Sequence, residues 1–255
     1  MLKFVKSLSA AAVLSVMTLS GAAAAGGGVE LKSATWNHTG MFGTYDRAAA
    51  QRGLQVYREV CAGCHGLGLV AMRTLQDLGF TEDEVKALSK EYTVMDGPDG
   101  EGEMFERPGK PSDKFPSPFA NENAARASNG GAYPLDLSLI VKARPGFENY
   151  LYSLLTGYVD APADFKLNEG MNYNAYFEGH QIAMPSPLSE DAVEYADGTP
   201  ATVDQMAKDV TVFLAWAAEP KLEERKHMGL RVILFLLIMT GLFYAVKKKV
   251  WSDLH

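Results

Sequence analysis

Hydrophobic positions recur along the chain mostly at the spacing of helices, and an apolar segment stands near each end. Close to the N-terminus, Lys3 and Lys6 precede an uncharged apolar run over 8–19, and small residues follow it. This run is shorter than the roughly 20 residues that a helix needs to cross a bilayer. The pattern is that of a secretory signal peptide. We therefore predict a signal peptide over 1–25 and an exported domain over 26–220.

The apolar segment near the C-terminus lacks a polar face. Residues from Val232 to Val246 carry no charge, and three lysines follow at once. A core helix of a soluble protein would keep a polar side, and a lysine-rich flank stays in the cytoplasm, so we predict that this segment crosses the membrane once. The predicted boundaries are a linker over 221–227, a transmembrane helix over 228–246 and a cytoplasmic tail over 247–255.

Between these two segments the pattern predicts helices separated by long loops rich in proline and glycine, without a run of alternating strands. We therefore expect an all-α fold. Such long loops between so few helices are unusual in a domain whose core consists of side chains alone. They become reasonable when a bound group fills part of the core. The first expected helix begins after the N-cap Asp46, and a capping box at Thr81–Glu84 opens the next, which extends to about residue 92. A second capping box, Thr202–Gln205, opens the last helix, which ends near Pro220. Two further helices are expected at 134–143 and 147–156, with loops over 96–118 and 158–200.

The distribution of charge narrows the choice of partners. Residues 26–219 carry 15 Lys and Arg against 28 Asp and Glu, a net charge of −13. This segment has no basic patch to meet phosphates, which excludes nucleic acid as a partner. The negative charge suits a basic protein partner, although it also keeps a domain soluble.

Both cysteines of the chain lie in the stretch VCAGCH, residues 60–65. A structural zinc site needs about four ligands, and the remaining histidines lack ligand spacing. A thioredoxin-like dithiol expects strands around it, which the pattern does not predict, and a plain Cys61–Cys64 disulfide stays an alternative in an exported protein. The spacing C-x-x-C-H is the attachment signature of c-type haem, in which both thiols form thioethers and His65 ligates the iron.

The helix before this motif also has the features of a helix crossing. Gly53 and Tyr57 lie about two turns and one turn before Cys61. A glycine allows a second helix to approach closely, and the aromatic ring packs beside the contact. We predict that the last helix supplies the matching surface with Phe213, Leu214 and Trp216.

The opposite side of the iron needs a second ligand. Met184 stands in QIAMPSPL, where two prolines stiffen the backbone and could hold its thioether in place. Most methionines only fill the core, so the residues by themselves leave Met184, His180 and an open position as alternatives. A His/Met pair gives a higher reduction potential than two histidines.

Several blocks of the sequence, in this order, resemble the cytochrome c1 family, the haem subunit of the quinol–cytochrome c oxidoreductase (cytochrome bc) complex, in its alphaproteobacterial type. The resemblance implies a cytochrome c-like haem domain with long loop insertions, one C-terminal transmembrane helix and one covalent haem c. The blocks are WNHTGMFGTYDRAAAQRGLQVYREVCAGCHGLGLVAMRTL (36–75), NGGAYPLDLSLIVKARPGFENYLYSLLTGY (129–158), YFEGHQIAMPSPL (176–188) and the final helix with its anchor.

The resemblance also implies roles for single residues. It places thioether bonds at Cys61 and Cys64 and makes His65 and Met184 the iron ligands. Arg144 matches an arginine that contacts a haem propionate, and the haem-pocket wall would include Asn129, Pro134 and Tyr150. The family usually has two prolines where this chain reads Pro134-Leu135, so the packing of the wall differs there.

The function implied by the resemblance is electron transfer from a Rieske iron–sulfur protein to a cytochrome c, in a dimeric complex with cytochrome b. The chain would sit in the cell inner membrane as a single-pass protein with its haem domain in the periplasm, and it would have no catalytic acid, base or nucleophile of its own. Two alternatives are a stand-alone membrane-anchored c-type cytochrome or terminal-oxidase subunit, and a haem-based ligand sensor.

Overall fold

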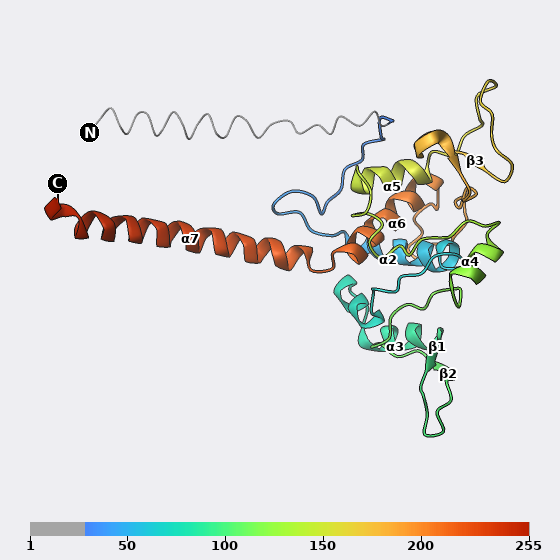
Figure 1. Ribbon diagram of the computed structural model, residues 1–255, viewed down its shortest axis with the longest axis horizontal. Coiled ribbons are helices and arrows are strands. Elements are labelled where there is room, and N and C mark those ends of the chain that lie inside the picture. Colours follow the sequence, from blue (N-terminus) through green and yellow to red (C-terminus); the bar gives the residue numbers. More distant parts are fainter. Residues whose placement is uncertain (1–28, 255) are drawn as a thin grey trace. The chain divides into compact units, whose positions relative to one another are not determined.

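The structure is a computed structural model that describes residues 29–254 (Figure 1). The predicted signal peptide lies outside these residues. The chain divides into two units after Glu30, and the description below concerns the second unit.

This unit is mostly helical with a small amount of strand, which confirms the predicted fold class. Its helical elements are α2 (Arg47–Val56), η1 (Tyr57–Cys61), η2 (Met72–Leu78), α3 (Glu82–Lys90), α4 (Glu122–Ser128), α5 (Phe147–Leu155), η3 (Glu178–His180), α6 (Val203–Ala218), α7 (Leu222–Val250) and η4 (Ser252–Leu254). Its strands form two antiparallel pairs, β1 (Thr93–Asp96) with β2 (Phe105–Pro108), and β3 (Asn172–Tyr173) with β4 (Gln181–Ile182).

Three of the predicted helix starts are confirmed at their N-caps. Asp46, Thr81 and Thr202 are the N-caps of α2, α3 and α6, and each side chain accepts a backbone N–H of the first turn. Thr81 and Glu84 form the full reciprocal capping box. The second expected box is only half formed, because the Gln205 side chain donates to Asp209 instead of returning to Thr202. These starts are local features, which is why the sequence predicts them well.

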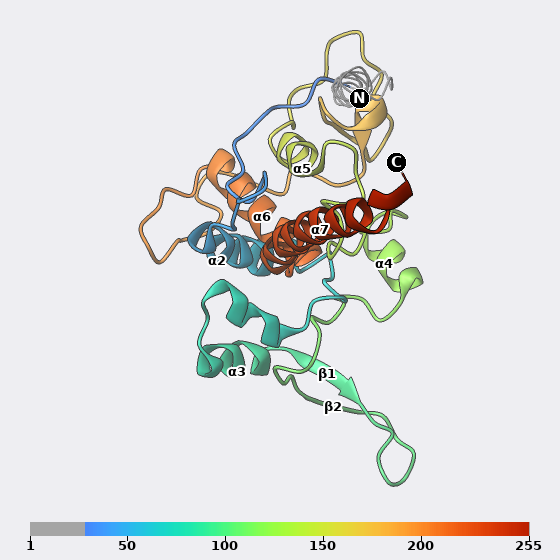
Figure 2. The same cartoon turned by 90° about the vertical axis from the view of Figure 1, so that its left-hand side faces the viewer.

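The core is built around the crossing of α2 and α6, which lie side by side in Figures 1 and 2. A Cβ atom added to Gly53 would lie 2.0 Å from the backbone oxygen of Asp209. The Arg52 guanidinium makes two hydrogen bonds to the buried Asp209 carboxylate, at 2.9 and 3.0 Å. One turn after Gly53, the ring of Tyr57 lies 5.9 Å from that of Phe213. The predicted close crossing at Gly53 is confirmed.

The expectation of a loop without strands over 96–118 is wrong, because β1 and β2 form a hairpin there. Thr93 pairs with Pro108, and Asp96 pairs with Phe105. The strand side chains are mostly exposed. Their sequence therefore shows no alternation of apolar and polar residues, and alternation is the signal that predicts a strand.

The helix expected over 134–143 does not form; the structure has irregular backbone over 134–137 and turns over 138–143. The backbone N–H of Leu137 donates instead to Gly66 O at 2.9 Å, far away in the sequence. An unpredicted helix, α4, stands earlier, with Asn121 as its N-cap. Tertiary hydrogen bonds, which a local pattern does not contain, decide the conformation of 134–143.

Among residues 29–254, α7 is the one helix that is long and apolar enough to cross a membrane. Helix α7 includes the whole predicted transmembrane segment, 228–246. Its first turns also include most of the predicted linker, 221–227. These first turns are bonded to the domain. The Glu223 carboxylate accepts two hydrogen bonds from Arg47, at 2.7 and 2.9 Å, and one from the backbone N–H of Tyr45 at 2.8 Å.

Candidate haem-binding site

The Cys-Ala-Gly-Cys-His motif begins with the last residue of a widened helical turn. Helix α2 passes into the π-helical turn η1, in which the N–H of Ala62 donates to Tyr57 O at 2.7 Å. Such turns often occur at functional sites. The N–H groups of Cys64 and His65 then bond back to Cys61 O at 3.1 and 2.9 Å. Both thiols are free, and burial raises the pKa of Cys61 to about 12. The motif is therefore a compact turn that presents two thiols and one imidazole.

The imidazole of His65 is held in one tautomer. Its Nδ1 lies 2.7 Å from the backbone oxygen of Leu135. A carbonyl oxygen only accepts, so Nδ1 carries the proton and Nε2 keeps a free lone pair. Burial lowers the pKa of His65, which also favours the neutral ring. The Tyr57 hydroxyl donates to His65 O at 2.9 Å and fixes the backbone. His65 is thus prepared to bind a metal through Nε2.

Three more hydrogen bonds join the segment after Pro134 to the segment after His65. We call residues 135–138 with their hydrogen bonds the histidine clamp. Asp136 and Ser138 were not predicted as functional residues, although two polar side chains closely after Pro134, in Asp-Leu-Ser (136–138), are a signal that could have found them. The bonds run from Leu137 N to Gly66 O (2.9 Å), from Gly68 N to Asp136 Oδ2 (2.7 Å) and from Leu69 N to Ser138 Oγ (3.1 Å).

We expect Asp136→Ala to loosen the histidine clamp. The substitution removes the acceptor for two backbone N–H groups, those of Gly68 (2.7 Å) and Ser138 (2.8 Å), and the loss of each bond costs about 1 kcal/mol. The haem-loaded Asp136→Ala variant should unfold at a lower temperature than the native chain. Its visible spectrum should also show a less ordered His65 ligand. Asp136→Asn keeps one of the two acceptor oxygens and should unfold at an intermediate temperature. Equal unfolding temperatures for Asp136→Ala and the native chain would show that Asp136 does not hold the clamp.

Met184 lies in a loop whose backbone is restrained from two sides. The Tyr158 hydroxyl donates to Met184 O at 3.1 Å, and burial raises the pKa of Tyr158, so the hydroxyl stays protonated. The side-chain amide of Asn172 donates to Ala183 O at 3.4 Å. The Met184 side chain itself is only partly buried. Its thioether is therefore accessible while its backbone is fixed.

The ring of the rival ligand His180 is held by two contacts within its own loop. Its Nδ1 lies 3.3 Å from the backbone oxygen of Asn174. Its ring stacks on that of Tyr173, with centroids 5.6 Å apart and an interplanar angle of 19°. These contacts hold His180 directly before β4, and its Nε2, like that of His65, keeps a lone pair.

Arg144, the expected propionate contact, is partly buried. Its Nη1 donates to the neighbouring Ala143 O at 3.1 Å. Within residues 29–254 its guanidinium makes no ion pair with a carboxylate. This cation could therefore pair with an anionic group of a ligand.

The three expected wall residues lie on different elements. Asn129 follows α4, and its side chain donates to Ala125 O at 2.7 Å. Pro134 directly precedes the histidine clamp, and Tyr150 lies in α5, partly buried. The structure thus joins Pro134 to the segment of His65, while no hydrogen bond within residues 29–254 links Asn129 or Tyr150 to it.

The chemistry of these residues fits a covalent haem. Two free thiols stand in one turn, His65 offers Nε2, and Met184 offers a partly exposed thioether. Beside the clamp, Leu69 and Leu135 remain 61% and 44% exposed, apolar surface that a haem could cover. Zinc fits less well, because residues 29–254 contain no group of three His, Cys, Asp or Glu side chains placed to hold a metal.

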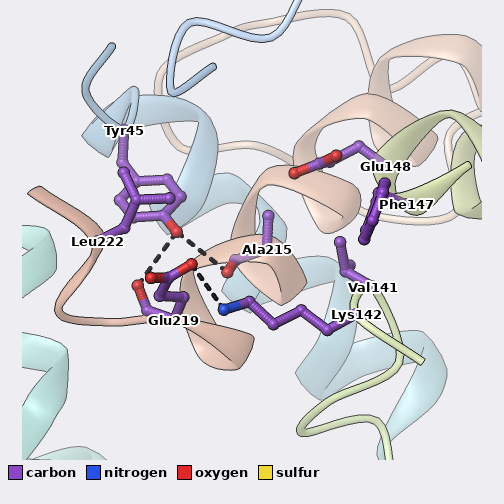
Figure 3. A pocket seen from close by; sticks show the side chains of 8 residues that line it. All are labelled: Tyr45, Val141, Lys142, Phe147, Glu148, Ala215, Glu219 and Leu222. Carbon is purple, nitrogen blue, oxygen red and sulfur yellow. Dashed lines mark hydrogen bonds and ion pairs between the residues drawn. The ribbon is translucent and has the colours of Figure 1, made fainter. Parts of the chain in front are cut away.

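A separate hollow of about 460 Å³ lies where α5, α6 and α7 meet (Figure 3). None of the predicted site residues lines it. The hydroxyl of Tyr45 donates to the backbone oxygens of Ala215 and Glu219, both at 3.1 Å, and Lys142 pairs with Glu219 at 2.6 Å. Tyr45, Lys142 and Glu219 thus bond to one another in this wall and Glu148 pairs with His38, so the hollow is part of the junction with α7.

Comparison with known proteins decides the family. The model of the Cytochrome C1 family matches residues 36–254. The chain belongs to the cytochrome c1 family. Among its relatives, cytochrome c1 of Rhodospirillum rubrum is 50% identical and the match covers 93% of this chain and 94% of that protein. The mitochondrial cytochrome c1 heme protein 1 of Arabidopsis thaliana is 53% identical (95% and 79% covered), and that of Saccharomyces cerevisiae is 51% identical (93% and 77% covered).

Membership of the cytochrome c1 family supports the broad function. It identifies the chain as a haem electron-transfer subunit of the quinol–cytochrome c oxidoreductase complex. The candidate span α7 agrees with a single-pass protein of a membrane complex.

Proposed function

We propose that this cytochrome c1 subunit accepts single electrons from the Rieske iron–sulfur protein and delivers them to a cytochrome c at the periplasmic face of the cell inner membrane. The observation that carries the proposal is the hydrogen bond from His65 Nδ1 to Leu135 O, which leaves Nε2 free beside two free thiols. This is the arrangement that c-type haem ligation requires.

Four residues would hold the haem. Cys61 and Cys64 would bind it through thioether bonds, and His65 Nε2 and the Met184 sulfur would ligate its iron. When bound, haem supplies an iron that changes its oxidation state by one electron, and the protein tunes its potential through the ligands and the surroundings. No acid, base or nucleophile of the chain is needed.

The protein's own contribution is to keep these ligands in place. The clamp fixes the orientation of His65, and the Tyr158 hydroxyl fixes the backbone of Met184. Ligands that are held by outer hydrogen bonds stay in place when the charge of the metal changes. Arg144 would neutralise a haem propionate, and Asn129, Pro134 and Tyr150 would form part of the pocket wall.

The negative charge of the exported domain supports a basic acceptor. Residues 26–219 carry a net charge of −13. We expect the rate of electron transfer to a lysine-rich cytochrome c to fall about tenfold or more as salt rises, since screening removes electrostatic steering. Stopped-flow mixing over a salt series measures this. Transfer to a small neutral oxidant should barely change and is the control. A flat salt profile with cytochrome c would show that the acidic surface serves solubility alone.

Isolation of the native membrane complex tests the electron path. We expect the chain to copurify with cytochrome b and the Rieske protein as a dimeric complex, and quinol to reduce its haem rapidly. A complex depleted of the Rieske protein should lose this reduction and keep the haem signal. Isolation of the chain alone would favour the stand-alone cytochrome, and avid carbon monoxide binding by the reduced native protein would favour the ligand sensor.

A further inference from the structure

The loop over 37–44 carries two large apolar side chains in the open. Met41 and Phe42 at its tip are 63% and 76% exposed. The segment 39–44 reads TGMFGT and contains no charged residue. Two neighbouring apolar side chains on an uncharged tip indicate a surface that contacts an apolar partner.

Hydrogen bonds of the backbone close this loop and keep its tip, with Met41 and Phe42, away from the domain. The N–H of Thr44 donates to Asn37 O at 3.1 Å and closes the loop, and the Thr39 hydroxyl donates to Trp36 O at 2.8 Å. A Cβ atom at Gly43 would lie 2.0 Å from Thr39 O, so the two sides of the loop touch. The tip is therefore a closed turn that presents Met41 and Phe42 outward.

The loop is tied to the start of the membrane helix. The Lys226 ammonium donates to His38 O at 2.6 Å and to Gly43 O at 3.1 Å. Lys226 lies in α7 two residues before Met228, the predicted start of the span, a rise of about 3 Å along the axis. Figure 1 shows the loop, in blue, on the side of the domain from which α7 leaves. The loop is thus held at the level where α7 enters the bilayer.

We infer that the 37–44 loop is a second membrane contact, in which Met41 and Phe42 enter the interfacial region of the outer lipid leaflet beside α7. This inference rests on the proposed anchoring of the chain by α7. Apolar side chains at the boundary of headgroups and acyl chains gain from leaving water.

A lipid surface suits this tip better than a protein partner. The tip is convex and offers two side chains, whereas a stable protein interface buries about 800 Å² on each partner. A weak lipid contact suffices here because α7 already keeps the loop at the membrane, so the second contact forms within one molecule. The loop therefore orients the domain relative to the bilayer.

Fluorescence quenching in the native complex tests the inference. The variant Phe42→Cys is labelled with an environment-sensitive fluorophore, since the two native cysteines are bound to haem in the proposed protein. The complex is placed in phosphatidylcholine vesicles with or without lipids that carry a nitroxide near the headgroup. We expect the nitroxide lipids to lower the emission about twofold or more, while aqueous iodide has little effect. The ratio with and without nitroxide cancels quenching by the haem.

Two labelled variants are the controls. Phe235→Cys lies in the predicted span of α7 and should be quenched by the lipids. Phe105→Cys lies in β2, 43% exposed, and should respond to iodide alone. If the label at 235 also escapes the lipids, the anchor itself fails and the proposed function with it. If the label at 235 is quenched while the label at 42 responds like that at 105, only this inference fails.

A further variant tests the role of Lys226. Lys226→Met removes both bonds to the loop and should at least halve the lipid quenching of the label at position 42, with the label at 235 unaffected. Unchanged quenching at 42 would overturn the part of the inference in which the Lys226 bonds from α7 hold the loop at the membrane. A label at 42 that is shielded from both lipids and iodide would show a protein partner over the tip, which also overturns it.

Discussion

Met184→Leu is expected to leave the haem covalently attached and to lower its reduction potential by on the order of a few hundred millivolts. Leucine matches methionine in volume and apolarity, so the pocket keeps its shape while the sulfur ligand disappears. The thioether bonds at Cys61 and Cys64 do not depend on Met184. The loop backbone keeps its hydrogen bond from Tyr158, because that bond ends on the main-chain oxygen of residue 184.

A redox titration of the visible spectrum measures this change in the purified membrane complex. Met171→Leu is a matched control, because Met171 is also partly buried and belongs to the same irregular region. We expect its potential to equal that of the native chain. If Met184→Leu left the potential unchanged, Met184 would not be a ligand of the iron. Loss of potential in a His180→Ala variant instead would revive the rival ligand.

Gly53→Ala is expected to destabilise the folded domain by about 3 kcal/mol or more, enough to reduce the amount of haem-loaded protein severely. The added Cβ atom would lie 2.0 Å from Asp209 O and 2.7 Å from the Cβ of Phe213. Both neighbours belong to α6, so the two helices must move apart, and the core around Tyr57 opens with them. Alanine normally stabilises a helix interior relative to glycine by about 0.5–1 kcal/mol. The expected sign is therefore opposite to the intrinsic preference.

Gly63→Ala is the matched control for this prediction. It lies inside the haem-attachment motif, yet an added Cβ atom there meets no neighbour within 4 Å. We expect Gly63→Ala to accumulate and unfold like the native chain. Thermal unfolding and the yield of covalent haem measure both variants. Normal yield and unfolding temperature for Gly53→Ala would mean that α2 and α6 do not cross as closely as described.

The parts of the fold that the sequence predicts well are set by neighbouring residues. Thr81 and Glu84 form a capping box because the two side chains reach each other across one helical turn. Gly53 indicates a helix crossing because only a residue without a side chain fits between two backbones. Both signals are complete within a short window of sequence, and both are confirmed.

The parts that the sequence predicts poorly depend on distant residues. The segment 134–143 contains a helix-like pattern, but its backbone is bonded to Gly66 and its Leu135 oxygen to His65. No local pattern contains these partners. The same holds for the functional site. The Cys-x-x-Cys-His motif predicts the covalent haem and one iron ligand, His65. The choice of Met184 over His180 as the second ligand needed the family resemblance, because both residues stand in one loop with similar local chemistry.

The central claim is that Cys61 and Cys64 bind one haem covalently, with His65 on its iron. The visible spectrum of the denatured chain in alkaline pyridine, taken after extraction with acidified acetone, tests it most directly. The account predicts that one haem per chain stays with the polypeptide and shows the band of a haem with two thioether bonds, and that the double variant Cys61→Ser/Cys64→Ser retains none. A haem that leaves the native chain on extraction, or a double variant that keeps its haem covalently, would contradict it.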